Sequence, residues 1–248
     1  MKYRIVLSLT AAGVLGSTAF AGTMGPVASP GNWSWVGSVS AGPVWAKGGD
    51  TQTFYLAPGI EKSYRAPESS NALASGELFV GIQKALTSQW LGQLGLAVAT
   101  TGDAKLQGVI WDDANAAFAN YSYQYKVRNT RVAVKGKLLL DKGYWALPWV
   151  SASLGVGFNR AQFTNTPLIF EAVPNANFSS HTSTAFSYTL GAGIQKAIGE
   201  HVQAGVGYEF ADWGKSSLGP ALGQTMNSGL SLSHLYTNGV LFNLTYVA

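Results

Sequence analysis

The chain of 248 residues contains no cysteine. This absence excludes a disulfide framework, thiol catalysis and any metal site built on cysteine. Charged residues are scarce as well: they make up 11% of the chain, against about 25% in an average soluble domain. The three histidines, His181, His201 and His234, show no HxH or HExxH spacing, so the sequence predicts no metal site and no cofactor.

No apolar run of 18 residues follows the N-terminal segment, so the sequence predicts no transmembrane helix. Hydrophobic residues nevertheless make up 47% of the chain, and glycine occurs 30 times. Aromatic residues are frequent, with 11 Phe, 8 Trp and 11 Tyr. A chain with so little charge and so many glycines and aromatics is unusual for a cytosolic enzyme.

The N-terminus has the three parts of a secretory signal peptide. Lys2 and Arg4 form a basic segment, residues 5–15 are apolar, and Ala19-Phe20-Ala21 is a small-x-small cleavage site. We expect residues 1–21 to be removed between Ala21 and Gly22, which leaves 14 basic and 12 acidic residues. That balance is too small to indicate nucleic-acid binding. An exported chain without a spanning helix is a soluble periplasmic or secreted protein, or an outer-membrane β-barrel.

Apolar and polar residues alternate strictly along eight segments. In 182–196 the even positions are mostly apolar or aromatic and the odd positions are small or polar, as in Tyr188, Leu190 and Ile194 against Gly191 and Gly193. A period of two predicts a strand and excludes an amphipathic helix. The segments are 33–45, 76–84, 90–100, 130–140, 148–158, 182–196, 202–210 and 239–246.

The connections between these segments alternate between short and long. The short ones are 85–89, 141–147 and 197–201, and the long ones are 47–74, 101–119, 159–181 and 212–228. Short turns on one side and long loops on the other are typical of outer-membrane barrels. The pattern therefore predicts an all-β fold: an eight-stranded antiparallel transmembrane up-and-down barrel over 33–248, after a short periplasmic segment at 22–32, with four long extracellular loops.

Two irregularities interrupt the pattern. Tyr121, Tyr123, Tyr125 and Val127 have the opposite parity to the apolar residues from Val132 onward. Either a β-bulge near residues 128–130 absorbs the slip, or residues 120–128 extend the strand above the membrane. A proline also lies within the first segment, at residue 43, where it removes one ladder hydrogen bond and is expected near the outer end.

The bulky apolar face is expected to point outward, toward lipid. Aromatic residues gather at both ends of the strands, at Trp33, Trp35, Trp90, Trp149 and Tyr246 on the short-turn side and at Trp45, Phe158, Tyr208 and Phe210 on the loop side. Two aromatic bands are typical of membrane-interface girdles, which predicts an outer-membrane location. The alternative is a soluble lipocalin-like barrel with an apolar cavity.

The run Gly191-Ala192-Gly193 with Gly199 resembles a phosphate-binding fingerprint. That motif needs a helix directly after its glycines, whereas here the glycines lie inside a predicted strand. Gly155-Val-Gly157 and Gly205-Val-Gly207 repeat the feature at the same parity. We therefore expect these glycines to provide room inside a narrow barrel.

Charged residues also share the inward parity. They are Glu77, Arg131, Lys135, Lys137 and Glu209, from three predicted strands. Because buried charges must be paired or hydrated, we expect an interior polar cluster of Glu77, Arg131, Lys135 and Glu209 with a structural role. The alternative is that some of them lie at wet barrel ends and never meet.

The signal peptide, the eight alternating segments and the aromatic-ended last segment GVLFNLTYVA resemble small Gram-negative outer-membrane β-barrels, including the opacity-type surface antigens. The segment GTMGPV, which would begin the mature chain, resembles Legionella-type outer-membrane proteins. The resemblance implies that outer-membrane lipid and lipopolysaccharide surround the barrel. It also implies that barrel assembly machinery recognises the last strand, in which the aromatic is Tyr246 rather than a terminal Phe.

Two classes of function fit these features. The first is a structural or surface-interaction barrel without catalysis, with long loops that contact a host or cell-surface ligand. The second is a lipid-active barrel enzyme or a narrow transporter of small apolar solutes. The sequence Ser233-His234-Leu235-Tyr236 lacks the Ser two positions after His that lipid A deacylases carry, and Asp103, Asp112 and Asp113 are expected to be solvated loop acids.

Overall fold

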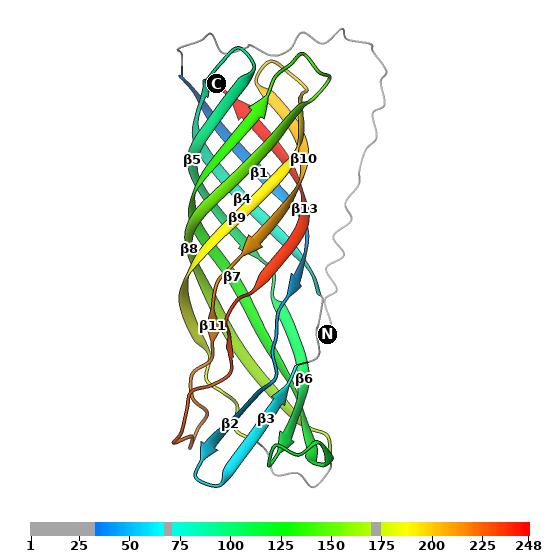
Figure 1. The fold of residues 1–248 in the computed structure, drawn as a ribbon, viewed down its shortest axis with the longest axis vertical. Helices are drawn as coiled ribbons and strands as arrows, with labels where there is room; N and C mark the ends of the chain where they lie inside the picture. The colour runs from blue at the N-terminus through cyan, green and yellow to red at the C-terminus, as the bar shows by residue number, and fades with distance from the viewer. Residues whose placement is uncertain (1–32, 67–70, 170–174) are drawn as a thin grey trace, which may run out of the picture.

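The computed structural model describes residues 33–66, 71–169 and 175–248 (Figure 1). The expected signal peptide, its cleavage site between Ala21 and Gly22, and the expected periplasmic segment lie outside these residues. The described strands are β1 (Trp33–Lys47), β2 (Gln52–Ala57), β3 (Ile60–Arg65), β4 (Asn71–Ala85), β5 (Trp90–Thr101), β6 (Ala104–Asp112), β7 (Ala119–Leu140), β8 (Leu147–Pro167), β9 (His181–Ala197), β10 (Val202–Asp212), β11 (Ser216–Ser217), β12 (Ser231–Leu232) and β13 (Tyr236–Val247). A 3-10 helix, η1 (Ala116–Phe118), precedes β7.

Eight of these strands close into a ring. The strands β1, β4, β5, β7, β8, β9, β10 and β13 each pair antiparallel with their neighbours in the chain, and β13 pairs with β1, with Val39 opposite Leu244. Each barrel strand contains one of the eight predicted segments. The prediction of an eight-stranded antiparallel barrel is therefore confirmed.

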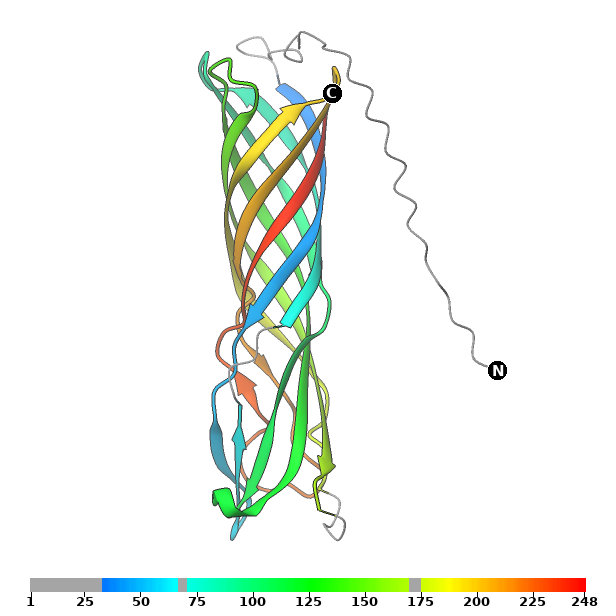
Figure 2. The ribbon, with the colours of Figure 1, turned by 90° about the vertical axis from the view of Figure 1, so that its right-hand side faces the viewer.

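The two ends of the barrel differ (Figures 1 and 2). The C-terminus and the short turns after β4, β7 and β9 lie at one end, which we call the turn end. At the other end β2, β3, β6, β11 and β12 continue beyond the ring with parts of β7 and β8, and we call this part the extension. Pro43 lies near the end of β1 toward the extension, as expected for a residue that cannot donate to the ladder.

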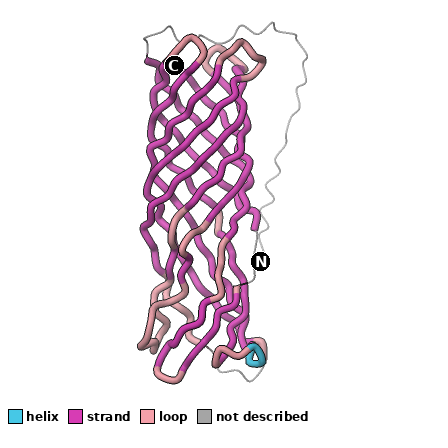
Figure 3. The backbone as a smooth tube through the Cα atoms, viewed as in Figure 1, coloured by secondary structure: helices cyan, strands magenta, loops and turns pink. Residues whose placement is uncertain are grey.

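Four long connections lie at this end as predicted, between β1 and β4, β5 and β7, β8 and β9, and β10 and β13, but much of them is strand rather than irregular loop (Figure 3). The strand β7 has 22 residues and β8 has 21, and both run from the ring into the extension. The hairpin of β2 and β3 pairs with β6, which pairs with β7. The extension is consequently a continuation of the barrel sheet.

The pairing of β7 with β8 distinguishes a bulge near residues 128–130 from an extension of the strand through residues 120–128. The register of β7 and β8 is unbroken from Tyr121 opposite Pro167 to Leu139 opposite Trp149, so no bulge occurs at residues 128–130. Tyr121, Tyr123 and Tyr125 are buried like Arg131, because they share its inward parity. The apolar residues therefore move from the outer face of the strand in the ring to its inner face in the extension.

Within the described part of the chain, no helix has the length and apolar character to cross a bilayer. The largest buried hydrophobic cluster instead lies inside the extension and its junction with the ring, where Leu106, Tyr123, Phe163, Trp213 and Leu232 meet.

Candidate functional site

Large apolar side chains cover the outside of the ring. Trp35 is 69% exposed, Leu154 62% and Phe242 61%, and similar residues on every ring strand are exposed to a comparable degree. A continuous apolar surface of this kind is not stable in water, but it matches the hydrocarbon core of a bilayer. The apolar face lies outside and the polar face inside, which is opposite to a soluble lipocalin-like barrel. The ring is a membrane-spanning barrel, and we call its outer surface the apolar belt.

Trp149 is an exception to the predicted aromatic girdle. We expected it to point outward, but it shares the odd parity of Ser151 and Ser153 and lies inside the barrel. Its ring lies where side chains at Gly193 and Gly207 would begin, and the Lys137 ammonium is 4.5 Å from the ring centre. The glycines of β9 and β10 therefore make room for an indole, which gives a concrete reason for their inward placement.

The structure brings the four residues of the expected polar cluster together in the lumen. One guanidinium nitrogen of Arg131, Nη2, donates to Glu77 at 2.9 Å and to Glu209 at 3.0 Å. The Lys135 ammonium contacts Glu77 and lies 3.2 Å from Glu209. The Arg131 side chain is 1% exposed and Glu77 3%, so both charges depend on these partners for stabilisation. Two cations and two carboxylates give the cluster no net charge.

Further side chains narrow the lumen on both sides of this cluster. The ring of Trp213 lies 4.8 Å from the Arg131 guanidinium, and its Nε1 donates to Thr237 Oγ1 at 2.9 Å. Toward the turn end, Lys137 donates to Gln195, and Gln93 donates to Gln83. The cavity at this level is small. It is lined by Glu77, Lys135 and Glu209 of the cluster, by polar residues such as Ser38, Ser40 and Asn243, and by the apolar side chains of Phe79, Trp149 and Leu241.

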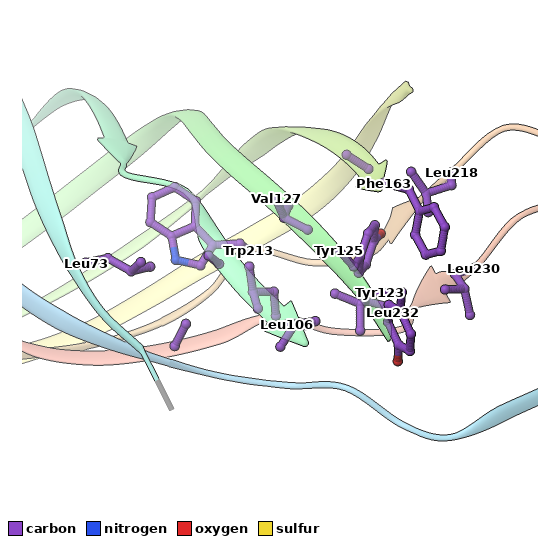
Figure 4. Packing of buried hydrophobic residues seen from close by; sticks show 14 of the residues in the cluster. Leu73, Leu106, Tyr123, Tyr125, Val127, Phe163, Trp213, Leu218, Leu230 and Leu232 are labelled. Atoms are coloured by element: carbon purple, nitrogen blue, oxygen red, sulfur yellow. The ribbon is translucent and has the colours of Figure 1, made fainter. Parts of the chain in front are cut away.

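Five aromatic rings form the centre of the extension. Phe54, Tyr64, Tyr123, Phe163 and Phe178 stack or meet edge to face, with ring centroids between 5.0 and 6.2 Å apart. Figure 4 shows Tyr123 and Phe163 with the neighbouring apolar residues of the cluster. The rings come from four strands, β2, β3, β7 and β8, and from the segment before β9. Such packing fixes segments that are far apart in the sequence relative to one another.

The far end of the extension exposes apolar side chains from two neighbouring segments. The backbone N–H groups of Thr225 and Met226 donate to the Leu56 carbonyl at 2.9 and 3.1 Å, and Asn227 donates to the Tyr55 carbonyl at 2.7 Å. These bonds hold the segment before β12 against the β2–β3 hairpin. Leu222 is 93% exposed there, and Tyr55 and Met226 are exposed as well. We call Tyr55, Leu222 and Met226 the tip patch.

Burial of tyrosines predicts that alkali destabilises the extension. Desolvation raises the pKa of Tyr123 and of Tyr125 from 10.0 to about 12 each. Below pH 10 both are neutral whether folded or unfolded, whereas above it only the unfolded chain ionises. Stability is therefore complete below pH 10 and is lost as the pH rises toward 12, by about 1.4 kcal/mol per unit for each tyrosine. Urea unfolding of the extension between pH 9 and 12 measures this loss. The variant Tyr123→Phe should lose less stability over this pH range. Unchanged stability of the parent protein between pH 9 and 12 would contradict the raised pKa values of the two tyrosines.

Two histidines at the junction of ring and extension contact groups that occur in hydrolases. His234 Nδ1 lies 2.8 Å from Asp212 Oδ2, and His181 Nδ1 lies 3.4 Å from the hydroxyls of Ser183 and Ser217. Over the described ranges, His234 has no hydroxyl and His181 has no carboxylate within hydrogen-bond distance. Neither pair is a complete set of nucleophile, base and acid.

Two of the three acids that were expected to be solvated in loops, Asp103 and Asp112, form ion pairs within the protein. Asp112 pairs with Lys62 at 2.8 Å and accepts a hydrogen bond from Asn120, and Asp103 pairs with Arg128 at 2.8 Å. These contacts join β3 to β6 and the residue before β6 to β7. Across residues 33–66, 71–169 and 175–248, no group of three metal-ligating side chains occurs.

Comparison with known proteins relates the chain to bacterial surface proteins. It is 24% identical over 250 residues to a candidate adhesin of Rickettsia bellii, strain RML369-C, and the match covers 98% of this chain and 100% of the relative. The counterpart from strain OSU 85-389 matches over the same shares at the same identity. No protein-family model matches.

Solved structures with a similar fold are outer-membrane or surface barrels. The outer membrane protease OmpT from Escherichia coli superposes with a TM-score of 0.50 at 9% identity, over 87% of this chain and 97% of that chain. Neisserial surface protein A gives a TM-score of 0.43 at 11% identity, over 87% of this chain and 98% of that one. At these identities the likeness concerns the fold.

Proposed function

We propose that the protein is an integral outer-membrane barrel that presents the extension outside the cell and contacts other cell surfaces through it, without catalysis. The observation that carries this proposal is the extension itself, an ordered sheet with its own aromatic core and an exposed apolar tip. Binding residues are most effective on a rigid scaffold, because little conformational entropy is lost on contact. The match to a candidate adhesin along the whole length supports the same role.

The proposal assigns each end of the barrel to one side of the membrane. Short turns face the periplasm and long connections face outward in outer-membrane barrels, which places the turn end inside. The incomplete histidine sets at the junction favour a binding barrel over a lipid-active enzyme. The side chains of Arg131, Lys135 and Trp213, which cross the lumen, favour it over a transporter.

The tip patch provides the test. Cells that display Tyr55→Ser, Leu222→Ser and Met226→Ser together should adhere to a host-cell layer about tenfold less than cells with the parent protein, because exposed apolar and aromatic anchors dominate such contacts. The matched control changes Leu86, Tyr144 and Trp145 to Ser, since these exposed aliphatic and aromatic residues lie in turns at the turn end. Equal adhesion of the tip variant at equal surface expression would refute the proposal.

A further inference from the structure

Basic side chains gather on the outer face of three neighbouring strands, where the ring passes into the extension. The register places Lys105 of β6 opposite Lys126 of β7, and Arg128 of β7 opposite Arg160 of β8. Lys126, Arg128 and Arg160 line a hollow together with Asp103 and Gln162. We call the three cations Lys126, Arg128 and Arg160 the basic patch.

The charges of the basic patch are only partly compensated within the protein. Like charges placed directly opposite each other on adjacent strands destabilise a sheet. Asp103 pairs with Arg128, while Lys126 and Arg160 have no carboxylate partner among the residues that the structure describes. The hollow therefore keeps two uncompensated positive charges around it, an arrangement that an anion between them would stabilise.

The height of the patch indicates which anion can reach it. Along β8 the last aromatic residue of the apolar belt is Phe158, and Arg160 is the next residue that points outward. Two residues of a strand span about 7 Å, so the basic patch begins where the hydrocarbon ends and polar headgroups start. It faces sideways from the barrel, toward neighbouring lipids rather than toward a partner that approaches the tip.

We propose that the basic patch binds the phosphate of a glycolipid headgroup in the membrane leaflet beside the extension. The inference rests on the proposed function for the side of the membrane on which that leaflet lies. The Arg160 guanidinium and the Lys126 ammonium donate to the phosphate oxygens, and Arg128, held by Asp103, forms the wall between them. A lipid held in this way anchors the junction of ring and extension at a fixed depth.

Binding of a phosphorylated lipid to the purified full-length barrel in detergent micelles tests the proposal. The probes are lipid A with both phosphates and the same lipid after enzymatic dephosphorylation. Each lipid is titrated into the barrel, and binding is followed by the fluorescence of the protein. The parent protein should bind the phosphorylated form preferentially, and Lys126→Gln with Arg160→Gln should weaken that binding at least about tenfold, because two charge-assisted contacts are lost. Arg128 is left in place so that Asp103 keeps its partner.

The control Lys142→Gln with Lys196→Gln removes the same charge from exposed lysines near the turn end and should bind like the parent. Equal binding by the patch variant would overturn the proposal, and so would equal binding of the dephosphorylated lipid by the parent. Displacement of lipid A by soluble heparin at lower concentration would also overturn it, in favour of a sulfated polysaccharide. Adhesion does not enter this measurement, so a failure here and a failure of the tip-patch test are separate results.

Discussion

Replacing Arg131 by Met should destabilise the barrel by about 3–5 kcal/mol, since removal of one partner leaves a buried charge uncompensated. Two carboxylates, Glu77 and Glu209, would then share the single ammonium of Lys135. The side chain of Met fills much of the volume of Arg, so the loss reports on charge more than on packing. Reversible urea unfolding in phospholipid vesicles, followed by tryptophan fluorescence, measures the difference.

Two further variants separate the charge effect from other causes. Arg131→Met combined with Glu77→Gln leaves one carboxylate facing one ammonium, so it should recover a substantial part of the lost stability. Arg128→Met removes an exposed pair on the same strand and should cost no more than about 1 kcal/mol. If Arg131→Met were as stable as the parent, the lumen would be hydrated and the cluster would have no structural role.

Alternation along the sequence was sufficient to predict the ring. It identified the eight segments, and it placed Glu77 and Arg131 on the inner face although they are far apart in the chain. The interior of an eight-stranded barrel is narrow, so charged side chains that point inward from several strands come into contact. How closely Glu209 and Lys135 approach Glu77 and Arg131 depends on the stagger of the strands, which a single sequence does not specify.

The extension could not be predicted in the same way. Its aromatic core joins Phe54, Tyr64 and Phe178 to β7 and β8, and these three residues belong to segments with weak alternation of their own. The signal that was available lay in Tyr121, Tyr123 and Tyr125, whose parity matches Arg131 and therefore continues one strand without a bulge. The prediction for Trp149 was wrong because it followed the aromatic character of the residue, whereas the odd parity of Trp149 indicates an inward side chain.

The inward Trp149 leads to a prediction about the glycines of β9 and β10. A bulky substitution, Gly193→Trp, should prevent barrel formation, because even a Cβ at residue 193 would lie 2.6 Å from the Gly207 Cα and against the Val206 carbonyl. The backbone atoms of a closed sheet cannot move apart, so the steric clash cannot be relieved. Loss of the heat-dependent gel mobility shift of the folded barrel measures the effect. The control Ala192→Leu adds bulk at the adjacent residue on the lipid-facing side and should fold normally.

Gly207 should respond differently from Gly193, because the atoms nearest to a Cβ at residue 207 belong to the movable ring of Trp149. We expect Gly207→Ala to cost about 1–3 kcal/mol by overpacking. In combination with Trp149→Ala the clash with the ring disappears and only the Ala192 carbonyl remains close, 2.9 Å from the Cβ. The double variant should therefore lose at least about 1 kcal/mol less than the sum of the two single losses. Trp149→Ala should couple less strongly to Gly193→Ala, since it removes the ring contact at residue 193 but leaves the clashes with the Val206 carbonyl and the Gly207 Cα. Strict additivity at Gly207 would mean that the indole lies elsewhere and that the glycine is needed for another reason.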